Sequence, residues 1–297
     1  MKRREGLSSS PMGDAINSYI QDSKKAQHFI LTRFNLGIYT KNWDDKKLED
    51  WYKRAFHLFE SFSYQSISQQ ITGSFTWVVI FDHLTPAHLR DKIESYRTLT
   101  NFTPVYVNEL EGKRRGIKAA IMPLIERDTE YVVTSNLDID DMIQKFYIDL
   151  AHKRVRLSDK HFFTFNKGYL LSVRNNDVEL WNVPQLNNQF SCFVDKPDFS
   201  KPYYGLSTIW AKPHGFLPHD KSVTKSVYSF TTNMPMWVWV LHNNNQTAST
   251  HNWKNDRPRG RNGEPWGLFE KSSIKELHAR FGFLWPKDWP TKWREYN

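Results

Sequence analysis

The stretch Tyr131-Val132-Val133-Thr134-Ser135-Asn136-Leu137-Asp138-Ile139-Asp140-Asp141 decides the fold prediction. Its apolar, β-branched first half predicts a buried strand, which ends in three carboxylates within four residues. Such clustered charge needs a positive partner, and Asp138 and Asp140 can direct oxygens at one hard cation, Mg²⁺ or Mn²⁺. The alternative is that the aspartates cap a following helix. We prefer the cap for Asp141 alone and a metal or phosphate site for the three together.

Around this stretch, short apolar runs alternate with helical periods. Predicted strands are residues 28–34, 75–81, 103–107 and 131–134, and predicted helices are residues 46–62, 85–96, 116–126 and 141–152. This alternation predicts a mostly parallel, doubly wound α/β sheet, which binds ligands outside the carboxyl ends of its strands. Polar residues at three of those ends, Thr32-Arg33, Asp82-His83 and the three aspartates, are therefore expected to share one rim.

The pattern changes after Ala151. Short strands at residues 162–165, 169–173, 178–183 and 191–194 predict a smaller antiparallel continuation, and residues 236–241 predict a buried strand that ends at His242. A short helix near residues 272–281 closes the chain. We divide one domain into a polar, basic N-terminal arm (1–27), an α/β half (28–152) and a second half (153–297).

The composition of the chain limits the kinds of partner that it is expected to bind. The 297 residues carry 41 Lys plus Arg against 32 Asp plus Glu, a net charge of +9, which favours nucleic acid, an anionic membrane surface or a nucleotide sugar. The single cysteine, Cys192, excludes an internal disulfide framework and fits a reducing cytoplasm. The longest apolar runs are too short to span a bilayer, so we expect no transmembrane segment. The sequence contains no G-x-S-x-G, Walker or G-x-G-x-x-G motif. This argues against a serine hydrolase, a P-loop NTPase and an ordinary dinucleotide enzyme.

Two further features suit phosphate chemistry. His242 follows an apolar strand and is a candidate metal ligand, although a lone histidine is more often structural. The polar loop 243–265 carries Lys254, Arg257, Arg259 and Arg261 between aromatic residues. Such a loop can close over phosphates, bind a nucleic-acid backbone, or simply be solvated.

Five blocks carry a resemblance to a known family. They are residues 28–35 (HFILTRFN), 56–60 with 65–70, 75–82 (FTWVVIFD), 134–141 and 236–242 (MWVWVLH). Together they resemble the rhamnosyltransferase-like glycosyltransferases of bacteria and their phages, in scattered blocks over about residues 28–245. The resemblance implies a GT-A-type fold whose first half binds the nucleotide sugar and whose second half faces the acceptor.

The resemblance also implies residue roles. Asp138 would lie near the donor ribose and the metal, Asp140 and His242 would ligate Mn²⁺ or Mg²⁺, and Thr32, Arg33 and Asp82 would surround the nucleotide. The family commonly has Thr-Thr-Arg before the acidic motif, whereas this chain has Thr134-Ser135-Asn136. Rhamnose is therefore not carried over as the donor sugar.

The resulting hypothesis is a metal-dependent hexosyl- or pentosyltransferase that moves a sugar from a nucleoside diphosphate sugar to an acceptor hydroxyl. Arg33 would offset charge on the leaving diphosphate, and Asp141, Asp195, Asp198 and Asp220 are candidate bases. The acceptor is a surface glycan, by family precedent, or a hydroxylated base of phage DNA, by the basic charge. The alternatives are a non-catalytic nucleic-acid-binding protein on a degenerate glycosyltransferase fold and, more distantly, a two-metal nuclease.

Overall fold

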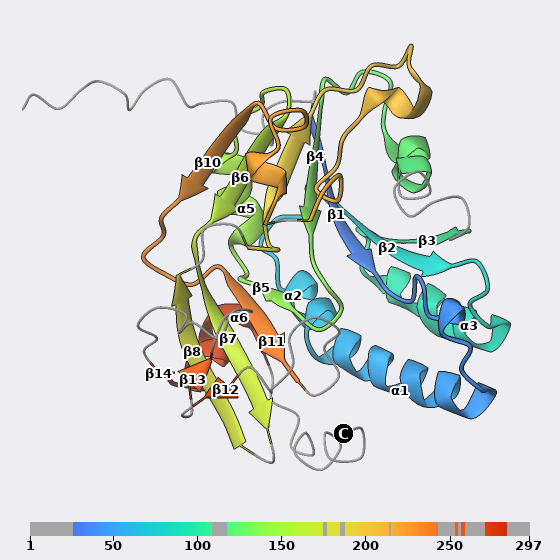
Figure 1. Ribbon diagram of the computed structural model, residues 1–297, viewed down its shortest axis with the longest axis vertical. Helices are drawn as coiled ribbons and strands as arrows, with labels where there is room; N and C mark the ends of the chain where they lie inside the picture. The colour runs from blue at the N-terminus through green and yellow to red at the C-terminus, as the bar shows by residue number, and fades with distance from the viewer. Residues whose placement is uncertain are drawn as a thin grey trace, which may run out of the picture.

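The computed structural model describes residues 26–108, 118–174, 177–184, 188–213, 215–242, 253–254, 257–258 and 271–283. These residues form two main sheets, which the acidic stretch after β4 connects (Figure 1). The predicted mixed α/β class, with a mostly parallel central sheet and an antiparallel part, is confirmed. The first strand begins at Ala26, within the predicted N-terminal arm, and residues 1–25 of that arm lie outside the described residues.

The larger sheet has the strand order β10-β6-β9-β4-β1-β2-β3. Its strands are β1 (Ala26–Arg33), β2 (Thr76–Asp82), β3 (Phe102–Val107), β4 (Tyr131–Asn136), β6 (His161–Phe165), β9 (Cys192–Asp195) and β10 (Ser226–Phe230). Strands β1 to β4 are parallel where they pair, whereas β9 runs antiparallel to both β4 and β6. The carboxyl ends at Arg33, Asp82 and Asn136 therefore lie at one edge of the sheet, and the predicted common rim is confirmed.

The smaller sheet has the order β14-β8-β7-β11-β5. Its strands are β5 (Met142–Ile143), β7 (Lys167–Arg174), β8 (Asp177–Pro184), β11 (Trp237–Leu241) and β14 (Lys271–Ser272). All its pairings are antiparallel except that of β7 with β11. A separate pair, β12 (Trp253–Lys254) and β13 (Arg257–Pro258), is antiparallel. Of the four strands expected in the antiparallel continuation, β7 and β8 belong to this second sheet, whereas β6 and β9 belong to the larger sheet.

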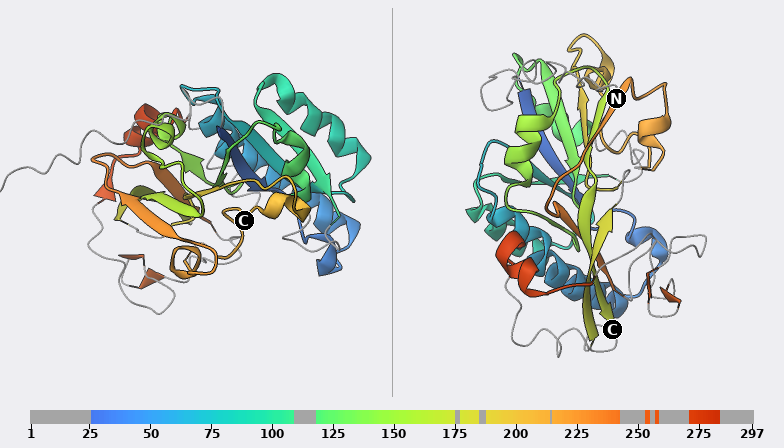
Figure 2. Two further views of the ribbon diagram at one scale, coloured as in Figure 1. Left: turned by 90° about the horizontal axis from the view of Figure 1, so that it is seen from above. Right: turned by 90° about the vertical axis from the view of Figure 1, so that its left-hand side faces the viewer.

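Helices and loops cover both faces of the larger sheet (Figure 2). The helices are α1 (Asp45–Ser61), α2 (Ser63–Ser68), α3 (Ala87–Ser95), α5 (Tyr147–Arg154) and α6 (Lys275–Phe281), with short 3-10 turns η1 (Tyr39–Lys41), η2 (Tyr96–Thr98), η4 (Met122–Leu124), η5 (Pro202–Gly205) and η6 (Leu217–His219). Because side chains alternate along a strand, Trp77 and Val79 of β2 pack with α1, α3 and α5. Val78 and Ile80 pack on the other face, against residues around Ile121 and Leu217.

Two predicted helices differ from the structure. The helix expected over residues 141–152 is wrong in its first half, because Met142 and Ile143 form β5 and pair with β11; the helix begins only at Tyr147. Met142 and Ile143 are 0% and 2% exposed. Their apolar side chains are therefore buried in a strand as completely as they would be on the inward face of a helix. Of the helix expected over residues 116–126, residues 118–121 are helical and lead into η4, where Pro123 lies.

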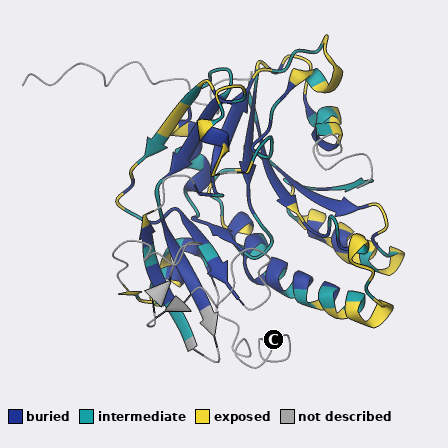
Figure 3. Cartoon of the chain, in the orientation of Figure 1, coloured by how far each residue is buried: buried dark blue, intermediate teal, exposed yellow. Residues whose placement is uncertain are grey.

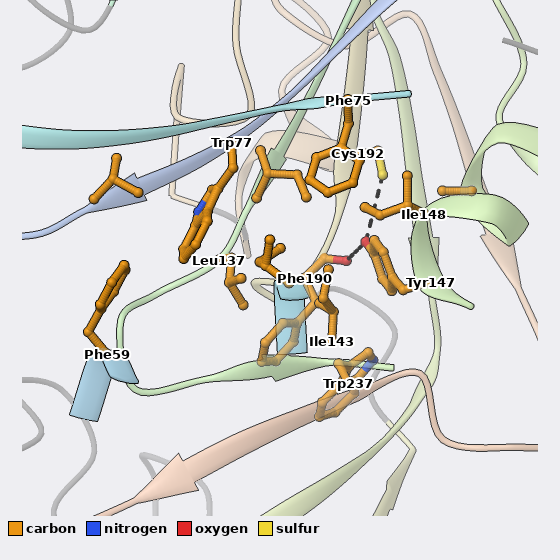
Figure 4. Packing of buried hydrophobic residues seen from close by; sticks show 14 of the residues in the cluster. Phe59, Phe75, Trp77, Leu137, Ile143, Tyr147, Ile148, Phe190, Cys192 and Trp237 are labelled. Atoms are coloured by element: carbon orange, nitrogen blue, oxygen red, sulfur yellow. Dashed lines mark hydrogen bonds between the residues drawn. The ribbon is translucent and has the colours of Figure 1, made fainter. Parts of the chain in front are cut away.

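Most residues of the two sheets are buried (Figure 3), and aromatic side chains such as Trp77, Phe190 and Trp237 pack in the core (Figure 4). Trp77 stacks on Phe59 of α1 with ring centroids 5.2 Å apart. Trp237 of β11 stacks on Phe190 at 5.0 Å, and its indole N–H donates to the Phe165 carbonyl at 2.9 Å. Burial of such large rings is the main stabilising contribution available to the fold. It also fixes β11, and hence His242, relative to the larger sheet.

A buried pair of histidines links β1 to α5. The imidazoles of His28 and His152 lie within hydrogen-bond distance, 3.0 Å from Nδ1 to Nε2, and His28 Nε2 lies 2.7 Å from Ser135 Oγ. Burial lowers the pKa of His28 well below its usual value, with the neighbouring His152 as a second cause. Burial also lowers the pKa of His152 to about 4. Both rings are therefore neutral in the folded protein at neutral pH.

We expect the protein to lose stability as pH falls from about 6.5 towards 4. In that window the unfolded state binds more protons than the folded state, so acid favours unfolding. The shift of His152 alone corresponds to about 3 kcal/mol. Thermal unfolding midpoints measured across this window should fall steeply in the wild type and less steeply in His152→Gln. The control His88→Gln changes an exposed imidazole and should keep the wild-type slope; equal slopes in all three proteins would contradict the assignment.

Candidate active site at the carboxyl edge of the parallel sheet

The acidic motif forms a turn between the two sheets. Leu137 continues the pairing of β4 with β1 by donating its backbone N–H to the Leu31 carbonyl, and a turn then closes when Asp141 N–H donates to the Asp138 carbonyl at 3.2 Å. Asp138 and Asp140 are half-buried, whereas Asp141 is only 2% exposed. The turn thus presents the first two carboxylates at the rim and directs the third inward.

His242 meets this turn from a strand 102 residues further along the chain. Its Nε2 lies 2.8 Å from Asp140 Oδ2, and its side chain is 4% exposed against 17% for Asp140. Strand β11 ends at Leu241, so the imidazole extends from the carboxyl end of a buried strand. The structure therefore brings together two of the three predicted metal ligands in direct contact.

Asp141 fastens the turn to β11. Its carboxylate accepts hydrogen bonds from the backbone N–H of Val240 at 3.0 Å and from the Gln189 amide at 3.3 Å. The alternative that Asp141 caps a helix is wrong, because β5 follows it and α5 starts six residues later. Since Val240 lies two residues before His242, this bond sets how His242 meets Asp140. The predicted catalytic role of Asp141 stays a prediction, to which the structure adds this positioning role.

Burial makes the turn electrostatically unfavourable when it carries full negative charge. Burial raises the pKa of Asp141 well above its usual value, and the charges of Asp140 and Asp138 raise it further. Burial likewise raises the pKa of Asp138, against the opposing effect of the Arg33 charge. A cation at the rim would relieve this repulsion.

The two residues at the end of β1 have different environments. Thr32 is fully buried, and its hydroxyl donates to the Leu137 carbonyl at 2.6 Å while accepting from the Trp77 indole. Thr32 thus holds the start of the acidic turn from its buried side. Its predicted contact with the nucleotide stays a prediction. Arg33 is exposed at the rim, where its charge acts on Asp138.

Asp82 belongs to a polar network at the end of β2. Its backbone N–H donates to Asn35 Oδ1 at 2.8 Å, and its carboxylate accepts from Leu84 N–H at 2.9 Å. The Asn35 amide donates in turn to the hydroxyls of Tyr52 and Thr85. The network orders the part of the rim next to Arg33. Sequence reasoning missed Asn35 and Tyr52; the available signal was an asparagine two residues after a buried strand end.

Asn136 and Trp210 are further rim residues that the sequence did not reveal. Trp210 Nε1 donates to Asn136 Oδ1 at 2.6 Å, and the Arg33 guanidinium carbon lies 5.1 Å from the centre of the Trp210 rings. The Asn136 side chain also acts on Asp138, where it opposes the rise in pKa that burial causes. Only the fold brings residue 210 beside the ends of β1 and β4.

The other candidate bases do not fit this rim. Asp195, whose pKa is raised to about 7 mainly by burial, pairs with Val132 in the sheet and so lies near the amino end of β4, about 13 Å along the strand from Asn136. Asp198 and Asp220 have pKa values lowered to about 2, chiefly by hydrogen bonds from Ser200 and Ser222. A carboxylate of such low basicity is a poor proton acceptor.

No three His, Cys, Asp or Glu side chains form a complete metal site within the part of the chain that the structure describes. The basic loop predicted over residues 243–265 lies largely outside it: β12 and β13 give the backbone of Lys254 and Arg257, and Arg259 and Arg261 are not described. Of the described helices, none has the length and apolar character needed to cross a membrane.

The fold and its rim define a mixed α/β protein with a polar site at the carboxyl edge of a parallel sheet, where such sheets bind their ligands. Residues 44–253, more than half of the chain, match the model of a family described as "Putative rhamnosyl transferase", and the chain belongs to that family. The predicted family resemblance is thus confirmed.

No curated protein sequence matches the chain significantly. Similar solved structures include TarS 1–349 of S. aureus, with 14% identity and a TM-score of 0.39 over 72% of this chain and 60% of that one. The inositol-1-phosphate CTP transferase of T. maritima gives 14% identity and 0.36 over 78% and 93%. Rv0371c of Mycobacterium tuberculosis H37Rv gives 11% and 0.31 over 72% and 92%. This chain therefore spans less than two thirds of the TarS chain.

Proposed function

We propose that this glycosyltransferase uses a divalent metal ion to transfer a sugar from a nucleoside diphosphate sugar to an acceptor hydroxyl. The observation that carries the proposal is the contact between Asp140 and His242, 2.8 Å apart at the carboxyl edge of the sheet, beside Asp138. Two carboxylates from one turn and the imidazole that follows β11 thus meet at this rim.

The residues present fit a metal that is bound together with the donor. Mg²⁺ in enzymes is usually held by one or two carboxylates plus substrate phosphates, rather than by a complete protein cage. Asp138 and Asp140 supply the carboxylates, and His242 supplies a nitrogen ligand that suits Mn²⁺ better than Mg²⁺. A divalent cation held there would offset the negative charge that develops on the leaving diphosphate.

In this proposal the remaining rim residues bind the donor and orient it. Arg33 carries a permanent positive charge at the open side of the turn and would pair with a phosphate oxygen. Asp82, whose backbone N–H donates to Asn35, would contact the nucleoside. Asp141 keeps the turn and His242 in register through its bond to Val240 N–H.

The acceptor belongs to one of two classes. Family membership favours a hydroxyl of a glycan, and the net charge of +9 favours a hydroxylated base of DNA. These classes differ in salt dependence, because binding to DNA releases counterions and weakens steeply as salt rises.

We expect one or more nucleoside diphosphates to raise the unfolding temperature in the presence of Mn²⁺ and much less in its absence. The measurement is a thermal-shift panel of UDP, GDP, dTDP, CDP and ADP, each with and without Mn²⁺. Binding of DNA without any nucleotide or Mn²⁺ effect would instead support the non-catalytic nucleic-acid-binding alternative and overturn the proposal. Salt-sensitive retention of DNA by a protein that also passes the nucleotide test would identify DNA as the acceptor.

A further inference from the structure

The loop after β9 is fastened to the sheet at three successive points. Ser207 N–H donates to Asp195 Oδ2 at 2.6 Å, Ile209 N–H to Thr134 Oγ1 at 2.8 Å, and Trp210 Nε1 to Asn136 Oδ1 at 2.6 Å. Asp195 is paired with Val132, so these bonds follow β4 from its amino end to its carboxyl end. The loop therefore delivers the Trp210 ring to the rim.

The Trp210 ring supports Arg33. The guanidinium carbon lies 5.1 Å from the ring centre, within the distance at which a cation is attracted to an aromatic face. An exposed arginine at the end of a strand otherwise samples many rotamers, and ordering it costs side-chain entropy. Contact with the ring restricts the guanidinium, while its N–H donors can still meet an anion.

Asn136 connects the same ring to the acidic turn. Its carbonyl oxygen accepts from Trp210, and Asn136 lies two positions before Asp138 in the chain. Asn136 is 7% exposed, so this bridge is largely shielded from water. One chain of contacts thus runs from Arg33 through Trp210 to Asn136, and the backbone continues from there to Asp138.

We propose that Trp210 is a positioning residue that holds the Arg33 guanidinium at the acidic turn, where the guanidinium contacts the diphosphate of the donor. This inference rests on the proposed function, because it assumes a diphosphate ligand at the rim. Trp210 acts through Arg33 and does not itself touch the phosphates.

A double-mutant cycle tests the proposal. The probe is the nucleoside diphosphate that stabilises the wild type most, measured by calorimetry with Mn²⁺; inorganic pyrophosphate replaces it if none does. We expect Arg33→Ala to weaken binding about 30-fold through loss of a charge-assisted contact, and Trp210→Leu about fivefold. In the Arg33→Ala background, Trp210→Leu should have almost no further effect.

Two more variants test whether weaker binding by Trp210→Leu reflects a general loss of structure. Trp210→Phe keeps an aromatic face for Arg33 but loses the bond to Asn136, so it should restore most of the affinity that Trp210→Leu loses. Tyr131→Leu is the matched control, because Tyr131 at the amino end of β4 also contacts a cation: Lys196 Nζ lies 4.8 Å from the centre of its ring. This variant should leave binding unchanged.

The outcomes separate this inference from the function on which it rests. If the wild type binds nucleoside diphosphate but Trp210→Leu costs the same in both backgrounds, or nothing in either, the positioning role is overturned and the function stands. If only pyrophosphate binds and the cycle shows coupling, the positioning role stands without the nucleotide donor. If the wild type binds neither probe, both proposals fail.

Discussion

Replacing Asp140 with Asn is expected to abolish donor turnover while leaving the fold intact. Asn keeps an oxygen that can accept from His242 but removes the negative charge, which lies 2.8 Å from the imidazole in the wild type. We expect release of nucleoside diphosphate from the donor to fall by about a thousandfold or more, since charge stabilisation of the leaving group is among the largest single contributions to catalysis. Mn²⁺ should no longer increase nucleotide binding.

The same variant should not be destabilised when no ligand is present. The charge of Asp140 raises the pKa of both Asp138 and Asp141, which means that it repels any negative charge on those two carboxyl groups. Removing one charge relieves that repulsion, so the unfolding midpoint at pH 7 should stay equal or rise. Asp91→Asn, on the exposed side of α3, is the matched control and should retain full turnover. Full activity of Asp140→Asn would show that the turn is not the diphosphate site.

Replacing Gly168 with Ala is expected to destabilise the protein by about 3 kcal/mol or more, because it overpacks a rigid part of the core. A Cβ at this position of β7 would lie 2.1 Å from Cδ2 of Trp237. The indole cannot move away, since it is fully buried, stacked on Phe190 and hydrogen-bonded to the Phe165 carbonyl. Chemical denaturation of the purified protein measures the effect.

Two comparisons make this stability prediction specific. Gly73→Ala places a Cβ where no atom lies within 4 Å, so it should change the free energy of unfolding little. In a Trp237→Leu background, Gly168→Ala should cost much less than in the wild type, because the ring it would meet is gone. Additive effects of the two substitutions would rule out the steric explanation.

Local sequence patterns predicted most of the parallel strands well, because each is a continuous apolar run between polar ends. Strand β2 was expected at residues 75–81 and lies at Thr76–Asp82. The same reasoning failed at Met142 and Ile143, whose apolar side chains fit a helical stripe as well as a buried strand. Their partner in the smaller sheet, Trp237–Val238, lies about 95 residues away, and a local pattern carries no information about it.

The sequence by itself determined that acidic and basic residues end three parallel strands, because the order of apolar runs and polar ends is a local property and parallel strands share one edge. Only the tertiary structure decided what each residue does there. In the folded protein Thr32 is buried in the core, Asp141 binds the backbone of β11, and Trp210 lies beside Arg33. Asp141 and Val240 are 99 positions apart in the chain, and Arg33 and Trp210 are further apart still. Their geometry therefore follows from packing of the two sheets and the loop between β9 and β10.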